Sequence, residues 1–219
     1  FDAITGARAS FALRTDGYVA TLATSGSTLV IGGNFRFVGT ATDGSGGTAR
    51  RSLAGINPVT GTPTSFDAGL DSPSFTIPGG PMIIPAVVVN DLSVDGETVF
   101  FGGTFSRVNG SVVRSNLAAA NVSTGQVTGF APPLSGLVSH VLVNGDSIYA
   151  SGEFTVDLGS GVFRSGTVAF DPTSGSVKPF EAQRAGGPLA LFDGKLTSSG
   201  QLEDDDPAPA FSRLLALDL

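Results

Sequence analysis

Short apolar runs alternate with turn residues along the whole chain. Three such runs, residues 27–35, 97–105 and 146–154, contain β-branched and aromatic residues and end in Phe, which is typical of β-strands. Each run follows a Gly-containing pair, and Asn-Gly or Asp-Gly between apolar runs indicates a hairpin with a type I′ turn. The three pairs are Ser25-Gly26, Asp95-Gly96 and Asn144-Gly145, and a fourth pair, Asp193-Gly194, precedes a degenerate run at residues 195–202. No stretch of about ten residues shows helical periodicity, so the pattern predicts an all-β protein.

A second pattern recurs between these runs. The segments 53–66, 117–130 and 167–180 each contain Asn or Asp, then Gly four residues later and Phe five residues after that Gly. Units of roughly fifty residues with four short strands are typical of a β-propeller, in which each unit forms one blade. The first strand of each unit is expected to carry an apolar residue at an equivalent position: Leu22, Leu92, Val141 or Ala190.

The repeat defines one β-propeller, or propeller fragment, over residues 1–219. About four antiparallel units of four strands are expected, at residues 18–66, 87–130 and 137–180, and at 188–219 completed by residues 1–11. The chain either closes as a ring of four or forms part of a larger propeller. The larger propeller is favoured, because four-bladed rings are uncommon and the repeat is cut within the third strand at both ends.

The repeated Asn/Asp-x-x-Thr/Ser-Gly, together with Gly-Gly-x-Phe, resembles the delta-60 repeat family of bacterial β-propeller proteins. The resemblance covers nearly the whole chain. The family pattern often has Trp where this chain has Phe, and the last unit has Leu202 in place of Phe. The resemblance implies a propeller in a large secreted or cell-surface bacterial protein. It carries no catalytic motif, so no catalytic residue is transferred.

Residues that recur in every unit are expected to serve the scaffold, and features that interrupt the repeat are candidates for function. Arg50, Arg114 and Arg164 each precede the repeated Asn/Asp by seven residues. Their repetition predicts a structural role, through hydrogen bonds to a neighbouring loop. The Asn/Asp itself is expected to close the following turn through an Asx-type hydrogen bond, with calcium binding as the lesser alternative.

Two insertions interrupt the repeat. The stretch from Phe66 to Leu92 is more than twice as long as the equivalent stretch from Phe130 to Val141, and a second insertion covers residues 40–47. Both fall in connections that lie on one face of an up-and-down blade. Loops of this kind often carry function, so this face is the predicted site of partner binding.

The first insertion, residues 74–86, is unusually apolar for a loop. Pro78, Pro81 and Pro85 oppose regular strand pairing over most of it. The loop either folds back over a blade edge or the channel, or presents an apolar surface to a partner chain. On the second interpretation, the partner-binding residues are Phe75, Ile77, Met82, Ile83 and Ile84.

The composition of the chain excludes several kinds of functional site and partner. The chain has no Cys and one His, which excludes disulfides, thiol nucleophiles and His-rich metal sites. A net charge of −7 argues against nucleic acid as a partner. The chain contains no run of about 18 apolar residues, the length that a membrane-spanning helix needs. No cofactor is expected. The last unit contains an acidic loop formed by Glu203, Asp204, Asp205 and Asp206. This loop is interpreted as solvated, with calcium binding as the alternative because hard cations prefer clustered carboxylates.

The leading functional hypothesis is a non-enzymatic scaffold that binds another protein subunit or a cell-surface component through the face with the insertions. A carbohydrate-binding propeller is the alternative, although the chain has no Trp and two Tyr for aromatic platforms. A glycoside hydrolase would need two carboxylates about 5–10 Å apart, for which Asp91 and Asp157 are the only candidates. His140 occupies the position of Asp91 in the next unit and is interpreted as scaffold.

Overall fold

The computed structural model of this chain describes residues 4–6, 11, 13–39, 47–159, 163–182, 186–201 and 212–218. Within these ranges every regular element is a β-strand, so the prediction of an all-β protein is confirmed. The same ranges hold no helix that is long and apolar enough to cross a membrane.

Four main antiparallel sheets follow one another along the chain, and in each the strands pair in sequence order. Sheet 1 consists of β2 (Tyr18–Ser25), β3 (Thr28–Asn34) and β6 (Leu53–Ile56). Sheet 2 consists of β9 (Val88–Asp95), β10 (Thr98–Thr104) and β13 (Leu117–Asn121). Sheet 3 consists of β14 (Leu134–Asn144), β15 (Ser147–Asp157), β16 (Phe163–Phe170) and β17 (Val177–Ala182). Sheet 4 consists of β18 (Leu189–Phe192), β19 (Lys195–Gln201) and β20 (Ser212–Asp218).

Smaller sheets lie before or between these strands in the chain. One joins β1 (Arg14–Thr15), β4 (Phe37–Gly39) and β5 (Thr48–Ala49). Another joins β11 (Arg107–Val108) and β12 (Val112–Val113) within the second unit. The third joins β7 (Phe75–Thr76) and β8 (Met82–Ile83), and lies in the apolar insertion.

Within the described residues, the predicted fourth strand forms fully in only one of the first three units. In sheet 3 it is β17, which pairs with β16. In the first two units, the corresponding segment makes one isolated bridge each, Ile56 with Pro63 and Ala120 with Val127. Pro63 has no N–H to donate, which limits the ladder in the first unit. The described residues therefore establish small antiparallel sheets, and four-stranded blades in every unit stay a prediction.

The hairpin turns differ from the predicted type in three of the four places. Ser25 pairs with Thr28, so the central turn residues are Gly26 and Ser27, and Gly26 has φ +54°. Glycine at the first central position with positive φ is typical of type II′ turns. Asp95-Gly96 and Asn144-Gly145 follow the same arrangement. In the last unit Asp193 and Gly194 both have positive φ, as type I′ requires.

This difference shifts the register of the last unit by one residue. Leu92 pairs with Phe101 in sheet 2, and Leu189 pairs with Ser198 in sheet 4. Leu189 therefore occupies the position of Leu92, and the alignment on Ala190 is wrong. The reason is the turn itself, because Asp193 is a turn residue whereas Asp95 is the last residue of its strand.

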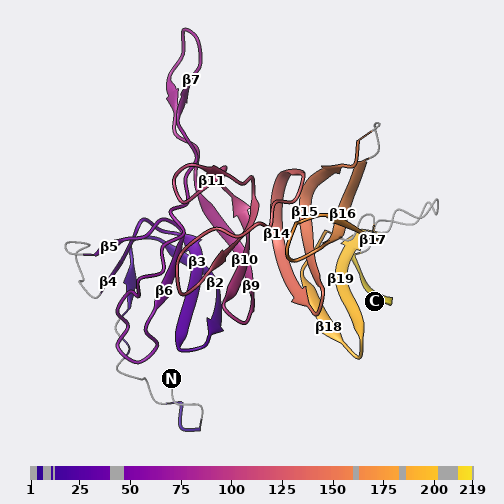
Figure 1. The fold of residues 1–219 in the computed structure, drawn as a ribbon, viewed down its shortest axis with the longest axis horizontal. Helices are drawn as coiled ribbons and strands as arrows, with labels where there is room; N and C mark the ends of the chain where they lie inside the picture. The colour runs from indigo at the N-terminus through magenta and orange to yellow at the C-terminus, as the bar shows by residue number, and fades with distance from the viewer. Residues whose placement is uncertain are drawn as a thin grey trace.

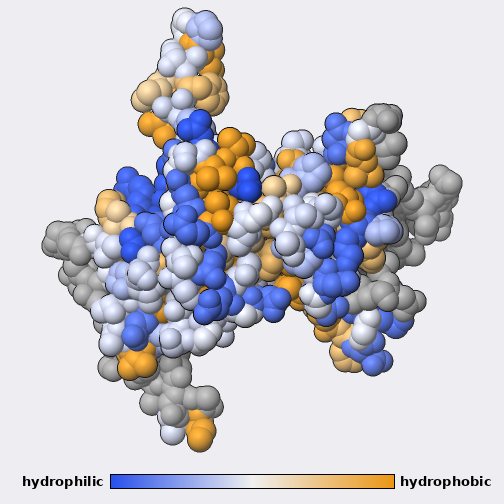
Figure 2. All heavy atoms as spheres, viewed as in Figure 1, coloured by the Kyte–Doolittle hydropathy of each residue, from blue (hydrophilic) through white to orange (hydrophobic). Residues whose placement is uncertain are grey.

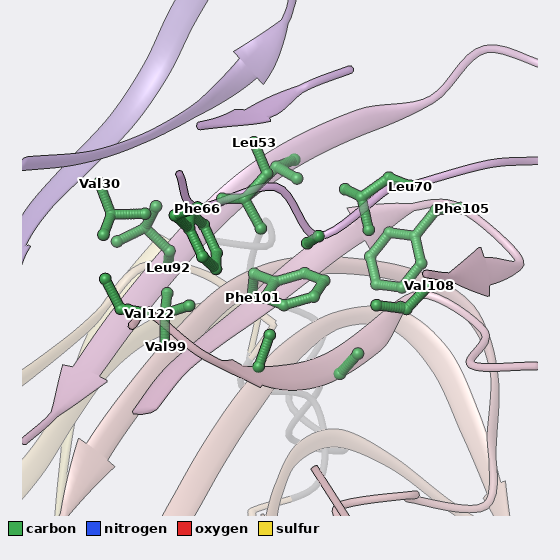
Figure 3. Close-up of a cluster of buried hydrophobic side chains, with 14 of the residues drawn as sticks. Val30, Leu53, Phe66, Leu70, Leu92, Val99, Phe101, Phe105, Val108 and Val122 are labelled. Atoms are coloured by element: carbon green, nitrogen blue, oxygen red, sulfur yellow. The ribbon is translucent and has the colours of Figure 1, made fainter. Parts of the chain in front are cut away.

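Successive sheets pack on one another in chain order. β2 and β3 contact β9, β9 and β10 contact β14, and β14 contacts β18 (Figure 1). The core between sheets 1 and 2 buries Phe66 of the first unit with Phe101 and Phe105 of the second (Figure 3). Phe130 is buried in the same way between sheets 2 and 3. The repeated Phe thus fills the space between units, as the sequence predicts.

The contact between the last two sheets is smaller. Its buried hydrophobic residues are Tyr149 and Ala169 of sheet 3 and Leu196 of sheet 4. Among the described strands, β2 and β18 make no extensive contact with each other. A closed ring of sheets is therefore not part of the described structure, and the propeller arrangement stays a prediction.

Candidate functional site

The apolar insertion forms a hairpin that projects from the sheets (Figure 1). Its strands, β7 and β8, have two residues each. Phe75 lies opposite Ile83, and Thr76 lies opposite Met82. The short pairing agrees with the prediction that the prolines prevent a regular strand over most of this segment.

Pro78 lies at the tip of the hairpin, where the turn needs no N–H donor. The turn is closed by the Gly80 N–H, which donates to the Ile77 carbonyl at 2.8 Å. Pro78 and Gly79 occupy the two central positions, and Gly79 has φ +75°. A type II turn favours Pro at the first of these positions and needs positive φ at the second. The sequence of the tip is therefore matched to its backbone.

The hairpin exposes most of its apolar side chains, and orange hydrophobic atoms lie among paler ones on its surface in Figure 2. Of the five residues proposed for partner binding, Ile83 is half-buried. The other four are exposed, at 54% for Phe75, 48% for Ile77, 60% for Met82 and 67% for Ile84. The structure thus differs from the alternative in which the insertion folds back over the sheets.

Both ends of the insertion are attached to the sheets. Asp71 exchanges two main-chain hydrogen bonds of 3.0 Å with Arg107, and its carboxylate forms an ion pair with Arg51. At the other end, Val87 is buried and its carbonyl accepts a hydrogen bond from the Ser52 hydroxyl at 2.8 Å. The hairpin therefore stands on a fixed base.

The other predicted loops contribute little to the described structure. The 40–47 insertion lies outside the described residues except for Gly47, as do all four residues of the acidic loop 203–206. The described part of the chain contains no group of three or more His, Cys, Asp or Glu side chains that could hold a metal ion. The calcium hypothesis for residues 203–206 thus stays a prediction.

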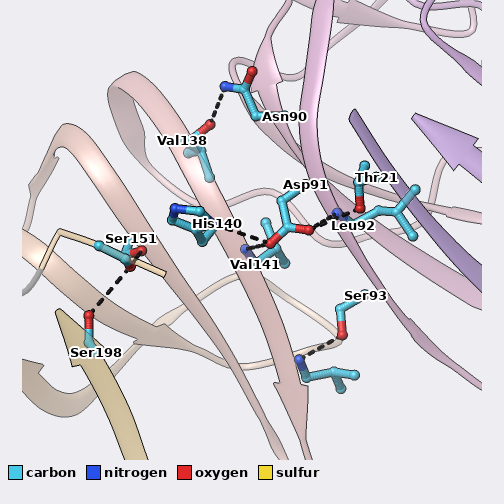
Figure 4. A network of polar contacts seen from close by, with 12 residues as sticks. Thr21, Asn90, Asp91, Leu92, Ser93, Val138, His140, Val141, Ser151 and Ser198 are labelled. Carbon is cyan, nitrogen blue, oxygen red and sulfur yellow. Dashed lines mark hydrogen bonds and ion pairs between the residues drawn. The ribbon is translucent and has the colours of Figure 1, made fainter. Parts of the chain in front are cut away.

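Asp91 links the first strands of three sheets (Figure 4). Its Oδ1 accepts hydrogen bonds from the Thr21 hydroxyl at 3.1 Å and the Leu92 N–H at 2.9 Å. Its Oδ2 accepts one from the Val141 N–H at 3.0 Å, and His140 Nδ1 lies 3.8 Å away. The carboxylate is thus occupied in joining sheets, and His140 lies beside this joint, as expected of a scaffold residue.

Asp157 lies in a different setting, at the exposed end of β15. Its Oδ1 accepts the Gly159 N–H at 2.7 Å. With Arg114 and the exposed side chains of Val113 and Phe163, it lines a surface groove of about 450 Å³. The described contacts of Asp157 share no residue with those of Asp91. Sequence reasoning missed this groove because its lining comes from two successive units and no motif marks it.

The repeated arginines brace the outer part of each unit. Arg114 donates through Nε to the Phe130 carbonyl at 3.0 Å and through Nη2 to the Thr128 carbonyl at 3.2 Å. Arg50 and Arg164 likewise bond the carbonyls fourteen and sixteen residues later. The predicted structural role is confirmed, with the acceptors in the last segment of the same unit rather than in a neighbouring loop.

The repeated Asn/Asp closes the turn after the third strand. In Asn57, Asn121 and Asp171, Oδ1 accepts the N–H groups two and three residues later at distances between 2.8 and 3.1 Å. The Asx-type prediction is confirmed. Hydrogen bonds from the N–H and hydroxyl of Ser174 also hold the pKa of Asp171 below its usual value. In all three units the side-chain oxygen therefore serves to close the turn.

Comparisons with known proteins bear on the fold alone. No known family profile matches the chain, and no curated protein matches it. The computationally designed Ika4 protein, known from a crystal structure, aligns with a TM-score of 0.51 at 12% identity, over 93% of this chain and 94% of that one. The designed Ika8 protein aligns with a TM-score of 0.29 at 13% identity, over 85% and 70%, which supports no further comparison. The chain thus shares an overall fold with a designed protein.

Proposed function

We propose that this chain is a non-enzymatic interaction module that binds a protein partner through the projecting hairpin. The observation that carries the proposal is the exposure of Phe75, Ile77, Met82 and Ile84 on a hairpin whose base is fixed. Contiguous exposed apolar residues of this kind mark interaction sites in soluble proteins.

The hairpin contributes little to the packing of the sheets. A two-stranded hairpin is at best marginally stable in water, and this one has two paired residues on each side. Residues 74–86 contain no charged side chain. A partner with an apolar groove would remove this surface from water, at about 25 cal/mol for each Å² buried. We therefore assign binding to apolar contact rather than to charge.

The scaffold behind the hairpin is proposed to be a larger β-propeller, in which sheets 1 to 4 are four of the blades. The support is the order of packing, in which the first strand of each sheet contacts the preceding sheet, and the repeat in the sequence. The resemblance to delta-60 repeats supports a secreted or cell-surface location in a bacterium. This location fits a module that meets another subunit or a surface component.

Replacement of residues 74–86 by a Gly/Ser linker of equal length tests the proposal. Affinity capture with the full chain should recover a partner that the linker variant no longer recovers. The matched control is Val59→Ser, which removes an apolar side chain that is 82% exposed on a different turn. Circular dichroism and thermal unfolding should be the same for all three proteins. Equal recovery of the partner by the linker variant would contradict the proposed site.

A carbohydrate-binding role is the second candidate. The groove beside Phe163 favours it, because an aromatic ring that is 60% exposed lies there with the carboxylate of Asp157. A glycan array tests this function directly. Binding that is lost in Phe163→Ala would support it, and an array without signal for the wild-type chain would dismiss it.

A further inference from the structure

The same contact joins sheet 1 to sheet 2 and sheet 2 to sheet 3. Val89 of β9 is fully buried and packs on Gly32 of β3, where an added Cβ would lie 2.6 Å from its Cγ1. Val138 of β14 is fully buried and packs on Gly102 of β10 in the same way. A large residue on the incoming sheet therefore meets a glycine on the receiving sheet, and we call this the Val-on-Gly contact.

Further contacts repeat with it. Leu92 and Val141, three residues after the two valines, are 6% and 3% exposed. The side chain of Ser52 donates to the Val87 carbonyl at 2.8 Å, and Asn116, at the matching position of the next unit, donates to the Gly136 carbonyl at 2.7 Å. Each sheet thus has a face turned toward the preceding sheet, here called its leading face, and a trailing face turned toward the next.

The junction of sheets 3 and 4 has smaller groups at the corresponding positions. Ser151 occupies the position of Gly32 and Gly102, and its hydroxyl donates to the Gly187 carbonyl at 2.7 Å. A residue as small as serine is therefore accepted at the receiving position. The trailing face of every sheet that has a following sheet carries Gly or Ser there.

Sheet 1 carries the incoming residues of this contact, and no sheet among the described residues receives them. Val19 holds the position of Val89 and is 39% exposed, and Leu22 holds the position of Leu92 and is 65% exposed. Phe11 and Leu13 pack on the outer part of this face, beside Ile31 and Phe35. The inner part of the leading face, formed by Val19 and Leu22, is left to solvent.

Sheet 4 offers the matching surface. Leu196 and Ser198 are buried on the side of sheet 3, so strand alternation places Ala190, Phe192 and Thr197 on the trailing face. Ala190 and Phe192 are exposed, Phe192 at 74%. Ser199 follows in the sequence at the position of Gly32 and Gly102.

We propose that the leading face of sheet 1 binds the trailing face of sheet 4 in a second copy of this chain, head to tail. The leading face of sheet 1 has the large incoming residues, and the trailing face of sheet 4 has the small receiving residue, as at the junctions inside the chain. Within one chain β2 and β18 make no extensive contact in the described structure, so a second copy covers both faces. A head-to-tail contact of this type closes into a ring or continues as a filament, according to its rotation.

Engineered cysteines test the contact, since the chain has none of its own. A Cβ at position 32 would lie 3.2 Å from the Cβ of Val89, so a small outward shift would bring the pair to the separation of about 3.5–4.5 Å in a disulfide. By analogy, chains with Val19→Cys and chains with Ser199→Cys should form a mixed disulfide when oxidised together. The Gly32→Cys, Val89→Cys double variant is the geometric control and should form its disulfide within one chain.

The double variant with Val19→Cys and Ser199→Cys separates the second copy from closure of a single chain. Disulfide-linked dimers and higher species support the proposal. A monomer with an internal disulfide overturns it, because sheet 4 of the same chain would then cover sheet 1.

The mass in solution provides an independent measurement. As the protein concentration increases, the wild-type mass should rise above that of a monomer. The Leu22→Glu variant should show this rise only at a concentration at least about tenfold higher. Val59→Glu, at an exposed position of the same unit, is the control and should behave like the wild type. A wild-type chain that stays monomeric throughout would also overturn the proposal. Neither experiment depends on the hairpin, so the partner-binding function can fail or stand separately.

Discussion

The ring of Phe130 meets the ring of Phe100 edge-on, with centroids 5.2 Å apart and planes at 88°. Phe130 is fully buried in the core between sheets 2 and 3. Phe180, at the same repeat position in the next unit, meets Tyr149 edge-on at 5.2 Å but is half-buried. Phe180 is therefore less buried than Phe130 at the same position of the repeat, because the core between sheets 3 and 4 is smaller.

Phe130→Ala should lower the free energy of unfolding by about 3–5 kcal/mol, because it leaves a cavity that the sheets cannot fill. Phe180→Ala should cost about 1–2 kcal/mol, since less of that side chain leaves water on folding. Urea unfolding of the two variants measures both values. Equal losses would show that the unequal burial of the two rings has no energetic consequence.

Gly32→Ala tests the Val-on-Gly contact inside the chain. The added methyl group would overlap Val89, and overpacking of this kind costs about 1–3 kcal/mol. Gly186→Ala is the control, because a Cβ there would meet only the Gly152 carbonyl oxygen at 3.7 Å. Thermal unfolding should show a clear loss for the first variant and little change for the second. Two similar unfolding temperatures would argue against close packing at residue 32.

Arg114→Lys should destabilise the second unit by about 1 kcal/mol or more. An ammonium group cannot hold the carbonyls of Phe130 and Thr128 at once, whereas the planar guanidinium does. Chemical denaturation of the variant measures the loss, with Arg14→Lys at an exposed position as the control. An unchanged midpoint for Arg114→Lys would mean that the charge, rather than the fork of donors, is what matters.

Asp171→Asn should reduce the sensitivity of the fold to acid. Hydrogen bonds from Ser174 lower the pKa of Asp171 in the folded chain, so its stabilising contribution is present above the unfolded pKa of about 3.9. It is lost as the pH falls through the lower, folded pKa. Asn at this position keeps the acceptor, as Asn57 and Asn121 do, but does not titrate.

The measurement for Asp171→Asn is the unfolding temperature at pH 7 and at pH 3. The wild-type value should fall further between the two than the value of the variant. Parallel falls would place the acid sensitivity at other carboxylates, such as Asp146, whose pKa is lowered by Lys178 and Ser147.

The features that the sequence predicts correctly are local. The Asx turns at Asn57 and Asn121 need only neighbours two and three residues away, so the repeated spacing is sufficient to find them. The repeated Phe is similarly recognisable, because a large apolar residue at a fixed position in every unit has to be buried. The all-β class follows from many such local signals.

The features that sequence reasoning missed join distant residues. The packing of Val89 on Gly32 connects two units, and no single segment contains both partners. The shift from Ala190 to Leu189 arises because Asp95 remains in its strand whereas Asp193 lies in the turn, a difference that two identical Asp-Gly pairs do not reveal. The composition of the 74–86 insertion fits both a folded-back loop and a projecting hairpin, and only the exposure of its side chains distinguishes them.

Site-specific photo-crosslinking tests the proposed partner binding most directly. A photoreactive phenylalanine analogue is placed at Ile84 on the hairpin and, in a second protein, at Val59, which is also exposed. Each protein is irradiated with the captured partner. A covalent adduct from position 84 and none from position 59 is the predicted result. An adduct from position 59 with none from position 84 would contradict partner binding through the hairpin.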